Sequence, residues 1–297
     1  MFDIKIGTLI PAEHALKMIP QLNPLGFESY ELNFGSAEST KIDINEFSKQ
    51  INEVLEGREI SALGFYCNPI KNDEERSGIA TLIENAHLFN CDCIGTFAGG
   101  NEKSVPDTIP DFVRAFKPLV ELAEDKGVKI GLENCGDGWN LDTYNIAFCP
   151  EAWELIFNEI TSDSLGLEWE PCHALMALID PIAQLRNWAK KVVHVHGKDA
   201  TVAYDVIREY GIRGIHEFAW NRTPGFGDTN WADIVTILIQ NGFEGAIDIE
   251  GYHDPVHYDD MEWTAQVTAL NYLKRCRGGI QYTCGPCEYR GYQGKRK

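Results

Sequence analysis

Long apolar segments are absent from this chain of 297 residues. No run approaches the roughly 18 apolar residues that a membrane-spanning helix needs, so we expect no transmembrane helix. The first residues, MFDIKIGTLI, lack the basic segment and long apolar stretch of a secretory signal, so we expect no signal peptide. The nine cysteines are scattered, and in a chain without a secretion signal they are expected to be reduced thiols. We therefore expect a soluble, cytoplasmic protein.

Positive charge is also scarce. The chain has 26 Lys and Arg against 45 Asp and Glu, which gives a formal net charge of −19. This balance disfavours a nucleic-acid partner, because proteins that bind a phosphate backbone display basic faces. It disfavours an anionic membrane surface for the same reason. Hydrophobic residues make up 44% of the chain and aromatic residues 11%, which is ample for a folded core and excludes wholesale disorder.

Short apolar runs alternate with amphipathic, helix-like segments along the whole chain. Eight runs are predicted as strands, at 3–9, 27–34, 59–66, 92–98, 128–134, 164–170, 192–198 and 245–251. The helix-like segments that follow them lie near 11–22, 43–57, 72–89, 110–126, 150–160, 180–190, 230–241 and 260–275. Pro110-Asp111 and Asp180-Pro181 are typical of the first turn of a helix, so we place two helix starts there.

Eight strands, each followed by a helix, are the number found in a (β/α)8 barrel. The main competitor, a doubly wound sheet, needs a glycine-rich phosphate turn after its first strand, and TLIPAEHALK (8–17) has none. We therefore predict an α/β protein with a single (β/α)8 TIM barrel over residues 1–275. Residues 199–229 form an insertion between strands seven and eight, with a helix-like piece of its own, TVAYDVIREYG. Residues 276–297 are a basic, Gly-rich tail, in which Cys284–Cys287 (CGPC) is a weak signal for half of a zinc knuckle.

Acidic and imidazole side chains gather where four consecutive strands end. Strand five ends in Glu133-Asn134, and the next three end in Glu168-Trp169-Glu170, His194-Val195-His196 and Asp248-Ile249-Glu250. In such barrels the carboxyl ends of the strands meet at one mouth, where the chemistry takes place. Carboxylates packed this closely repel and raise each other's pKa values unless a cation compensates them. Any one of these acids alone is often a loop cap or a salt-bridge partner, but four ligand-type residues on four consecutive strands, three carboxylates and one imidazole, favour a shared metal site.

The set Glu133, Glu170, His196 and Glu250 is rich in hard oxygen ligands. We expect Mn²⁺ there, with Mg²⁺, Co²⁺ or Zn²⁺ as alternatives. His194 and His196 face the same side of their strand, with His196 roughly 6–7 Å nearer the mouth. His196 is therefore the expected ligand, and His194 is expected to fill an inner layer or support the site from below. Two cysteines, Cys135 and Cys172, are expected to be neighbours of a hard metal rather than its ligands.

Several motifs taken together resemble a known family. GLEN (131–134), GLEWEPCH (166–173), HVHGKDA (194–200), PGFGDTNW (224–231) and IDIEGYHDP (247–255) are similar to motifs of the xylose isomerase-like TIM-barrel family of sugar isomerases and epimerases. The resemblance covers most of residues 3–275. It implies that the same four residues bind the metal, and that His173 contacts substrate oxygens. The family usually has an Asp where this chain has Glu170, a difference that would shift the metal by about one methylene.

Two further features bear on the reaction class. Relatives that epimerise free ketohexoses carry a second catalytic Glu six residues after the strand-five ligand, where this chain has Trp139. GKDATVAYDVIREYGIRG (197–214) and NRTPGFGDTNW (221–231) also resemble C-glycoside deglycosidases, which are metal-dependent lyases of 3-keto glycosides with a smaller partner subunit. This resemblance keeps elimination of an aglycone from a 3-keto glycoside open as the alternative reaction.

The expected function is a metal-dependent sugar isomerase or epimerase of carbohydrate metabolism. It would abstract a proton next to a sugar carbonyl and pass through a metal-stabilised enediolate. By family analogy Glu250 is the expected base, His173 is the next candidate, and Glu133 completes the catalytic set. The expected substrate contacts are His173, Lys198, Arg222 and Trp139, although Lys198 fits a salt bridge with Glu133 or Glu170 equally well. Trp169, Trp220 and Trp231 fit either stacking on a sugar or packing.

Two rival classes share the scaffold. A nuclease of the endonuclease IV type would need three zinc ions, more histidines on its strands and a basic groove, which the acidic balance opposes. A non-catalytic partner subunit would be expected to lose one of the four ligands, and all four positions are filled. We expect a small-molecule sugar or glycoside as the partner of the site. We also expect a homo-oligomer, with a small partner subunit as a further candidate.

Overall fold

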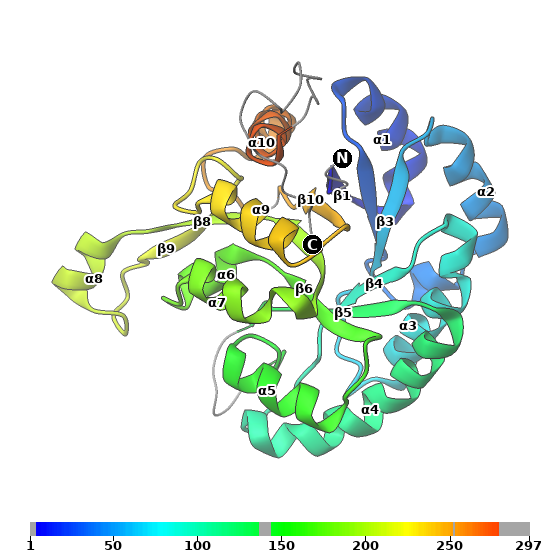
Figure 1. Cartoon of the computed structure of the whole chain (residues 1–297), viewed down its shortest axis with the longest axis horizontal. Helices are drawn as coiled ribbons and strands as arrows, with labels where there is room; N and C mark the ends of the chain where they lie inside the picture. The colour runs from blue at the N-terminus through cyan, green and yellow to red at the C-terminus, as the bar shows by residue number, and fades with distance from the viewer. Residues whose placement is uncertain (1–3, 137–143, 252, 279–297) are drawn as a thin grey trace, which may run out of the picture.

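The computed structural model describes residues 4–136, 144–251 and 253–278. Eight parallel strands close into a barrel in the order β1-β10-β7-β6-β5-β4-β3-β2, with helices around it (Figure 1). The predicted (β/α)8 fold is therefore confirmed. The strands are β1 (Lys5–Pro11), β2 (Ser29–Asn33), β3 (Glu59–Gly64), β4 (Cys93–Thr96), β5 (Lys129–Glu133), β6 (Leu165–Trp169), β7 (Val192–Gly197) and β10 (Ala246–Ile249).

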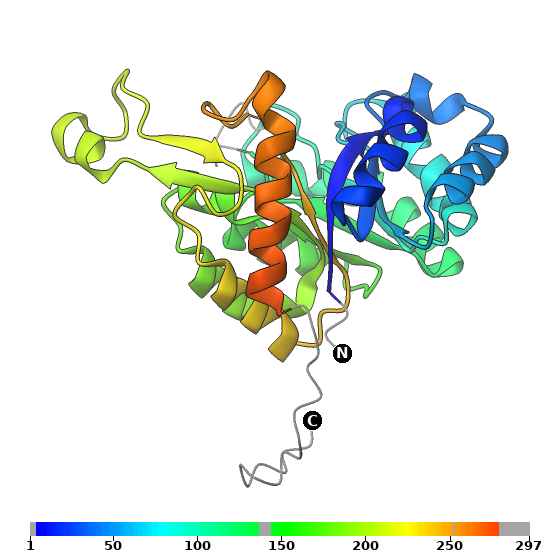
Figure 2. The ribbon, with the colours of Figure 1, turned by 90° about the horizontal axis from the view of Figure 1, so that it is seen from above.

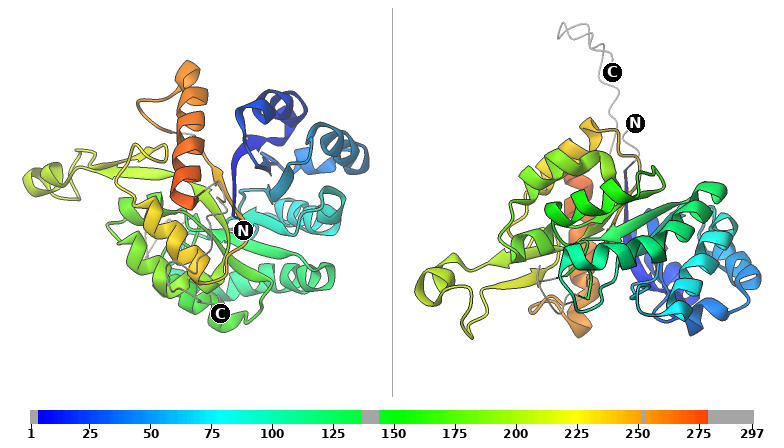
Figure 3. Two further views of the ribbon diagram at one scale, coloured as in Figure 1. Left: turned by 45° about the horizontal axis from the view of Figure 1, so that its top comes forward. Right: turned by 90° about the horizontal axis from the view of Figure 1, so that it is seen from below.

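Nine helices of the described chain pack around the barrel. Figures 1 and 3 show them as an arc outside the strands. A short helix that the sequence did not predict, α6, directly follows β6 and carries His173. The helices are α1 (Ala15–Leu22), α2 (Ile44–Val54), α3 (Asp73–Asn85), α4 (Val105–Lys126), α5 (Pro150–Glu159), α6 (Pro171–Met176), α7 (Pro181–Trp188), α9 (Trp231–Gln240) and α10 (Glu262–Arg277).

One of the two predicted helix starts is right and one is wrong. Asp180 Oδ1 accepts the backbone N–H groups of Ile182 and Ala183 at 2.8 and 3.2 Å, so it caps α7 as expected. In contrast, Pro110 lies inside α4, which begins five residues earlier. Ser104 caps that helix by accepting the N–H of Asp107 at 3.3 Å, and a proline near the first position, Pro106, fits the start. The earlier serine-proline signal therefore determines the boundary.

The strands around the predicted site have two chemically different faces. Apolar side chains of β5, β6, β7 and β10 belong to the hydrophobic core, among them Leu132, Leu167, Val195 and Ile247. Alternate residues project into the barrel, because they contact side chains of strands that are not their neighbours: His194 of β7 reaches Glu31 of β2. A residue two positions further along a strand points to the same side. The interior-facing residues of each strand therefore form a row that ends at the mouth of the barrel.

The predicted insertion forms an arm outside the barrel. β8 (Asp199–Val202) and β9 (Ala219–Arg222) pair antiparallel and α8 (Tyr204–Tyr210) lies between them, so the predicted helix is present. The arm projects from one side of the molecule in Figures 1 to 3. Asp199 ties its base to the barrel by accepting the N–H of Thr229 at 3.0 Å and the indole N–H of Trp231 at 3.2 Å.

The last helix closes the described chain beside the first strand (Figure 2). α10 continues to Arg277, so the first two residues of the predicted tail are helical. Arg277 Nη1 donates to the carbonyl of Ile4 at 2.7 Å and its guanidinium pairs with Glu28. Residues 279–297 of the predicted tail, with the CGPC motif, lie outside the described residues. No helix within the described ranges combines the length and apolarity that crossing a bilayer requires.

Candidate metal centre

The four predicted ligands meet at the mouth of the barrel. One ligand atom from each of Glu133, Glu170, His196 and Glu250 lies within 4.8 Å of the other three. We call these four residues the outer cluster. Glu133 and His196 lie on β5 and β7, and Glu170 and Glu250 directly follow β6 and β10; these four strands are adjacent in the closed sheet. Three are buried and Glu250 is slightly exposed, so three carboxylates lie together where solvent has little access.

Lys198 is the charged partner of the outer cluster. Its Nζ lies 2.6 Å from Glu250 Oε1, and the residue is 4% exposed. The salt bridge expected with Glu133 or Glu170 is thus made with Glu250 instead. Burial alone would raise the pKa of Glu250, but Lys198 lowers it below its usual value. The pKa of Glu133 is raised well above its usual range by burial and by the neighbouring Glu170 carboxylate. The single positive charge of Lys198 therefore does not neutralise the three carboxylates of the outer cluster.

Three polar atoms of the outer cluster are buried without a hydrogen-bond partner among the described residues. They are Glu170 Oε1, His196 Nδ1 and Glu250 Oε2. His196 Nδ1 and Glu250 Oε2 lie 3.3 Å apart. Buried polar atoms left in this state cost free energy, and a divalent cation among them would satisfy all three. The donor set of three carboxylates and one imidazole suits Mn²⁺ and similar ions. The residues present therefore fit a divalent metal.

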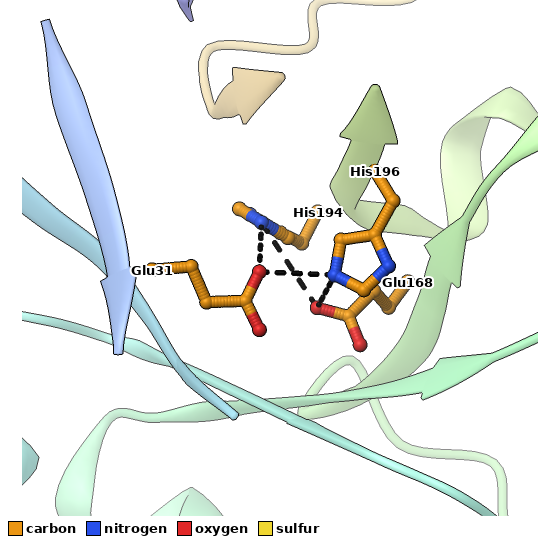
Figure 4. A group of neighbouring side chains, drawn as sticks. All are labelled: Glu31, Glu168, His194 and His196. Carbon is orange, nitrogen blue, oxygen red and sulfur yellow. Dashed lines mark hydrogen bonds and ion pairs between the residues drawn. The ribbon is translucent and has the colours of Figure 1, made fainter. Parts of the chain in front are cut away.

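A second set of ionisable side chains lies on the interior faces of the strands. We call Glu31, Glu168, His194 and Asp248 the inner cluster; Figure 4 shows three of them with His196. Glu31 Oε2 is 3.1 Å from His194 Nε2, which in turn is 3.2 Å from Asp248 Oδ2. His194 thus occupies the inner position that the sequence predicted for it.

Glu31 links the two clusters through His196. Its Oε2 lies 2.9 Å from His196 Nε2, so a carboxylate accepts the N–H of that nitrogen (Figure 4). In the tautomer that carries its proton on Nε2, the other ring nitrogen, Nδ1, is free to act as a ligand, and it lies 3.3 Å from Glu250 Oε2 in the outer cluster. A carboxylate behind the imidazole is the usual support of a metal-binding histidine, because it fixes the tautomer and the ring orientation. Burial would raise the pKa of Glu31, but the two histidines lower it, which keeps the carboxylate ionised.

Glycines make room for the inner cluster. A Cβ at Gly95 of β4 would lie 2.5 Å from Glu168 Oε1, and one at Gly7 or Gly64 would collide with Asp248 or Glu31. Sequence reasoning missed the role of Glu31, and also that of Tyr66, whose hydroxyl contacts Glu31, Glu168 and His196. The one available signal was glycine in the middle of predicted strands, which marks a close approach of other atoms.

Two asparagines fix the backbone from which the outer cluster projects. Asn134 Oδ1 accepts the N–H of Glu170 at 2.7 Å, and its Nδ2 donates to the Glu170 carbonyl at 2.9 Å. Asn145 Nδ2 donates to the carbonyl of Glu133 at 3.0 Å. These bonds hold β5 and β6 at a fixed separation just where the strands end. His173, one turn into α6, then places Nε2 2.7 Å from Glu170 Oε1.

The other predicted substrate contacts are distributed differently. Trp169 and Trp231 are fully buried, and their indole N–H groups bind Gln184 and Asp199, so the stacking role considered for them is wrong. Trp220 is half-buried on β9. Arg222 lies on the same strand, with its Nε 3.3 Å from Asp254 Oδ2. Trp139 lies outside the described residues.

Comparisons with known proteins agree with this architecture. The chain is 25% identical over 272 residues to the uncharacterized protein YfiH of Bacillus subtilis, covering 76% of this chain and 84% of that protein. It is 31% identical over 166 residues to inosose dehydratase of Clostridium beijerinckii, covering 54% of this chain and about half (52%) of the dehydratase.

Solved structures share the fold at low sequence identity. A xylose isomerase domain protein from Planctomyces limnophilus superposes with a TM-score of 0.72 at 18% identity, covering 92% of this chain and 97% of that one. The 3-keto-D-glucoside 4-epimerase YcjR from E. coli superposes with a TM-score of 0.69 at 16% identity, covering 92% of this chain and 100% of the epimerase chain. Residues 20–276 match the family described as xylose isomerase-like TIM barrel. With that match over most of its length, the chain belongs to the xylose isomerase-like TIM-barrel family.

Proposed function

We propose that this protein is a divalent-metal-dependent sugar isomerase or epimerase. It would remove a proton from the carbon next to a sugar carbonyl. The observation that carries the proposal is the outer cluster, whose unpartnered Glu170 Oε1, His196 Nδ1 and Glu250 Oε2 converge at the mouth. Family membership supports the same class of chemistry, because relatives of this fold include sugar epimerases and a dehydratase by name.

Glu133, Glu170, His196 and Glu250 would hold the ion, and we favour Mn²⁺. When bound, it would act as a Lewis acid that makes the C–H bond beside a sugar carbonyl more acidic. Glu250 is our candidate base. Because Lys198 lowers its pKa, this carboxylate is ionised at neutral pH and ready to accept a proton. Lys198 would then hold the developing negative charge on a substrate oxygen with its remaining N–H groups.

His173 contacts the outer cluster at Glu170, whereas Lys198 contacts it at Glu250. His173 Nε2 is buried, has no hydrogen-bond partner among the described residues, and lies 3.9 Å from Glu133 Oε1. We assign it to contact a substrate oxygen and to return or remove a proton from a second direction. Glu133, whose raised pKa favours the protonated form before a cation binds, would serve as ligand and as the third member of the catalytic set.

Elimination is the second candidate reaction. The 31% identity with an inosose dehydratase favours it, because loss of water from a keto-polyol begins with the same proton abstraction. The arm carries the residues that resemble C-glycoside deglycosidases, so a glycoside that loses its aglycone belongs to the same alternative. We further propose a cytoplasmic protein that forms a homo-oligomer, alone or with a small partner subunit, and that does not bind nucleic acid.

Deuterium exchange tests the proposal. The Mn²⁺-loaded protein is incubated in D₂O with ketoses, 3-keto glycosides and inososes, and the products are followed by NMR. We expect deuterium at one carbon beside the carbonyl for at least one substrate, and its loss in Glu250→Gln. Glu121→Gln, on the exposed face of α4, is the control. No exchange with any of the three classes would contradict the function, and full exchange in Glu250→Gln would contradict the assigned base. Release of water or of an aglycone would favour elimination.

A further inference from the structure

Sulfur lies beside the outer cluster. Cys135 follows Glu133 by two residues, and Cys172 lies between Glu170 and His173. Both are free thiols; Cys135 is partly exposed at the mouth and Cys172 is buried. Ligand atoms of Glu133, Cys135 and His173 lie within 4.8 Å of one another, and so do those of Glu170, Cys172 and His173. His173 is thus common to two groups of metal-ligand type that each contain a thiol.

The donor types of this region, a thiol and an imidazole beside a carboxylate, suit a soft or borderline cation. Zinc binds sulfur at about 2.3 Å and nitrogen or oxygen at about 2.0–2.2 Å, so tetrahedral ligands lie roughly 3.3–3.8 Å apart. The separations here are within about 1 Å of that range, which rotation of the Cys135 and His173 side chains can supply. Tyr144 OH lies 2.9 Å from Cys135 Sγ, where it would donate to a thiolate. A hydroxyl in that place supports a ligand in the way that Glu31 supports His196.

The hydrogen bonding of His173 also points to a ligand at the same place. His173 Nε2 and Glu170 Oε1 are 2.7 Å apart, yet neither atom has a hydrogen-bond partner of acceptable geometry among the described residues. The Glu170 side chain is fully buried. Because Glu170 Oε1 is already assigned to the ion of the outer cluster, the buried and unpartnered His173 Nε2 is the atom left for a second ligand. The inner cluster also contains one such atom, Glu168 Oε1, but it has no thiol, and its Glu31 and His194 bond to each other.

We propose that the mouth holds a second cation of the Zn²⁺ class, ligated by Glu133, Cys135 and His173. Cys172 and Glu170 flank this position, which shares Glu133 with the outer cluster. Hard Mn²⁺ and thiophilic Zn²⁺ would thus occupy adjacent positions according to ligand softness. The second site itself does not depend on the proposed function, but its effect on activity does. Zinc would bind the His173 imidazole that we assign to the substrate, so it would inhibit the manganese enzyme.

Cobalt spectroscopy tests the second position without any substrate. The reduced, Mn²⁺-loaded full chain is titrated with Co²⁺ under anaerobic conditions, and the near-ultraviolet thiolate-to-cobalt charge-transfer band is recorded. We expect a band that saturates at one Co²⁺ per chain. Cys135→Ser should abolish it, whereas Cys67→Ser and Cys149→Ser, at buried thiols elsewhere in the core, should retain it. Elemental analysis with Zn²⁺ in place of Co²⁺ should then give one zinc beside one manganese.

Further variants separate the possible failures. Glu250→Gln removes a ligand of the outer cluster only, so the band should persist there even if manganese binding and proton exchange are lost. Loss of the band in Glu250→Gln would mean that the thiol binds the same cation as the outer cluster does, and would overturn the second position. Absence of any band, or a band that survives Cys135→Ser, would overturn it as well. Zinc should also protect Cys135 of the parent chain from alkylation by at least tenfold, a measurement that needs no variant to fold.

Discussion

Glu31→Gln is the sharpest test of how the barrel interior prepares the metal ligands. Glu31 Oε2 accepts from His196 Nε2 at 2.9 Å and from His194 Nε2 at 3.1 Å. Glutamine has nearly the same shape and keeps one acceptor oxygen, but it removes the negative charge. The imidazole of His196 then becomes less basic, and its ring and tautomer are less firmly held. Both changes weaken Nδ1 as a ligand, although this nitrogen is not touched by the substitution.

The expected magnitude follows from the contacts that remain. Loss of a carboxylate behind a metal-binding histidine typically costs 10–100-fold in metal affinity. The glutamine carbonyl can still accept the His196 N–H, and Tyr66 OH remains 3.0 Å from Nε2, so we expect the lower end of that range. A loss of about tenfold corresponds to about 1.4 kcal/mol in the free energy of binding.

Isothermal titration calorimetry with Mn²⁺ measures this loss, and Asp248→Asn is the matched control. Asp248 is an equally buried carboxylate that contacts His194 at 3.2 Å together with Ser29 and Ser61, so both variants lose one interior charge. Only Glu31→Gln should weaken Mn²⁺ binding substantially. If it binds Mn²⁺ as tightly as the parent chain does, or if Asp248→Asn is weakened equally, Glu31 does not act through His196.

Three other predictions concern stability. Burial alone would raise the pKa of Asp254, but the N–H groups of Thr223, Val256 and His257 and the charge of Arg222 lower it to about 2. The folded pKa therefore lies below the unfolded one, so the ionised side chain stabilises the folded protein at pH 7. Asp254→Asn should lower the free energy of unfolding in urea at pH 7 by about 2 kcal/mol. This cost should disappear as the pH falls from about 4 towards 2, and a pH-independent gap between the two proteins would contradict the assignment. Gly95→Ala should lower the free energy of unfolding by about 1–3 kcal/mol, because the added Cβ would lie 2.5 and 2.6 Å from the Glu168 oxygens. Gly35→Ala is the control: its Cβ would meet nothing within 4 Å, so the free energy of unfolding in the same urea titration should not change. Mn²⁺ at a hundred times its Kd should stabilise the protein by about 2.7 kcal/mol in a thermal melt, and an equal shift in Glu170→Gln would argue against the outer cluster as its site.

Strand positions and the outer cluster were accessible from the sequence because both are local patterns. Glu170, His196 and Glu250 each lie at or just beyond the end of a strand, and their strands are neighbours in the barrel. The chain order of the strands thus brought them together without knowledge of side-chain contacts. The start of α4 was misplaced since two proline signals compete there, and the upstream one is capped by Ser104.

Contacts across the barrel could not be predicted from the sequence in this way. Glu31 lies 165 residues from His196, on a strand that is not its neighbour, and no local pattern links them. Lys198 was assigned the correct kind of interaction with the wrong partner, because three carboxylates of the outer cluster lie within its reach. Trp169 and Trp231 show the same limit, since only the fold reveals that their rings are buried and that their indole N–H groups bond to Gln184 and Asp199.

The pairing of β1 with β10 has a consequence for how the protein is made. The first and last strands of the barrel are partners, so a nascent chain cannot close the sheet until residues 246–249 have been synthesised. Until then β1 and β7 each present an unpaired edge, which is the condition under which sheets aggregate. Asp248 and Glu250 arrive with the same segment, and Arg277 then bonds to Ile4 and Glu28 across the seam. Closure of the sheet and assembly of the ionisable centre are therefore one event, late in translation.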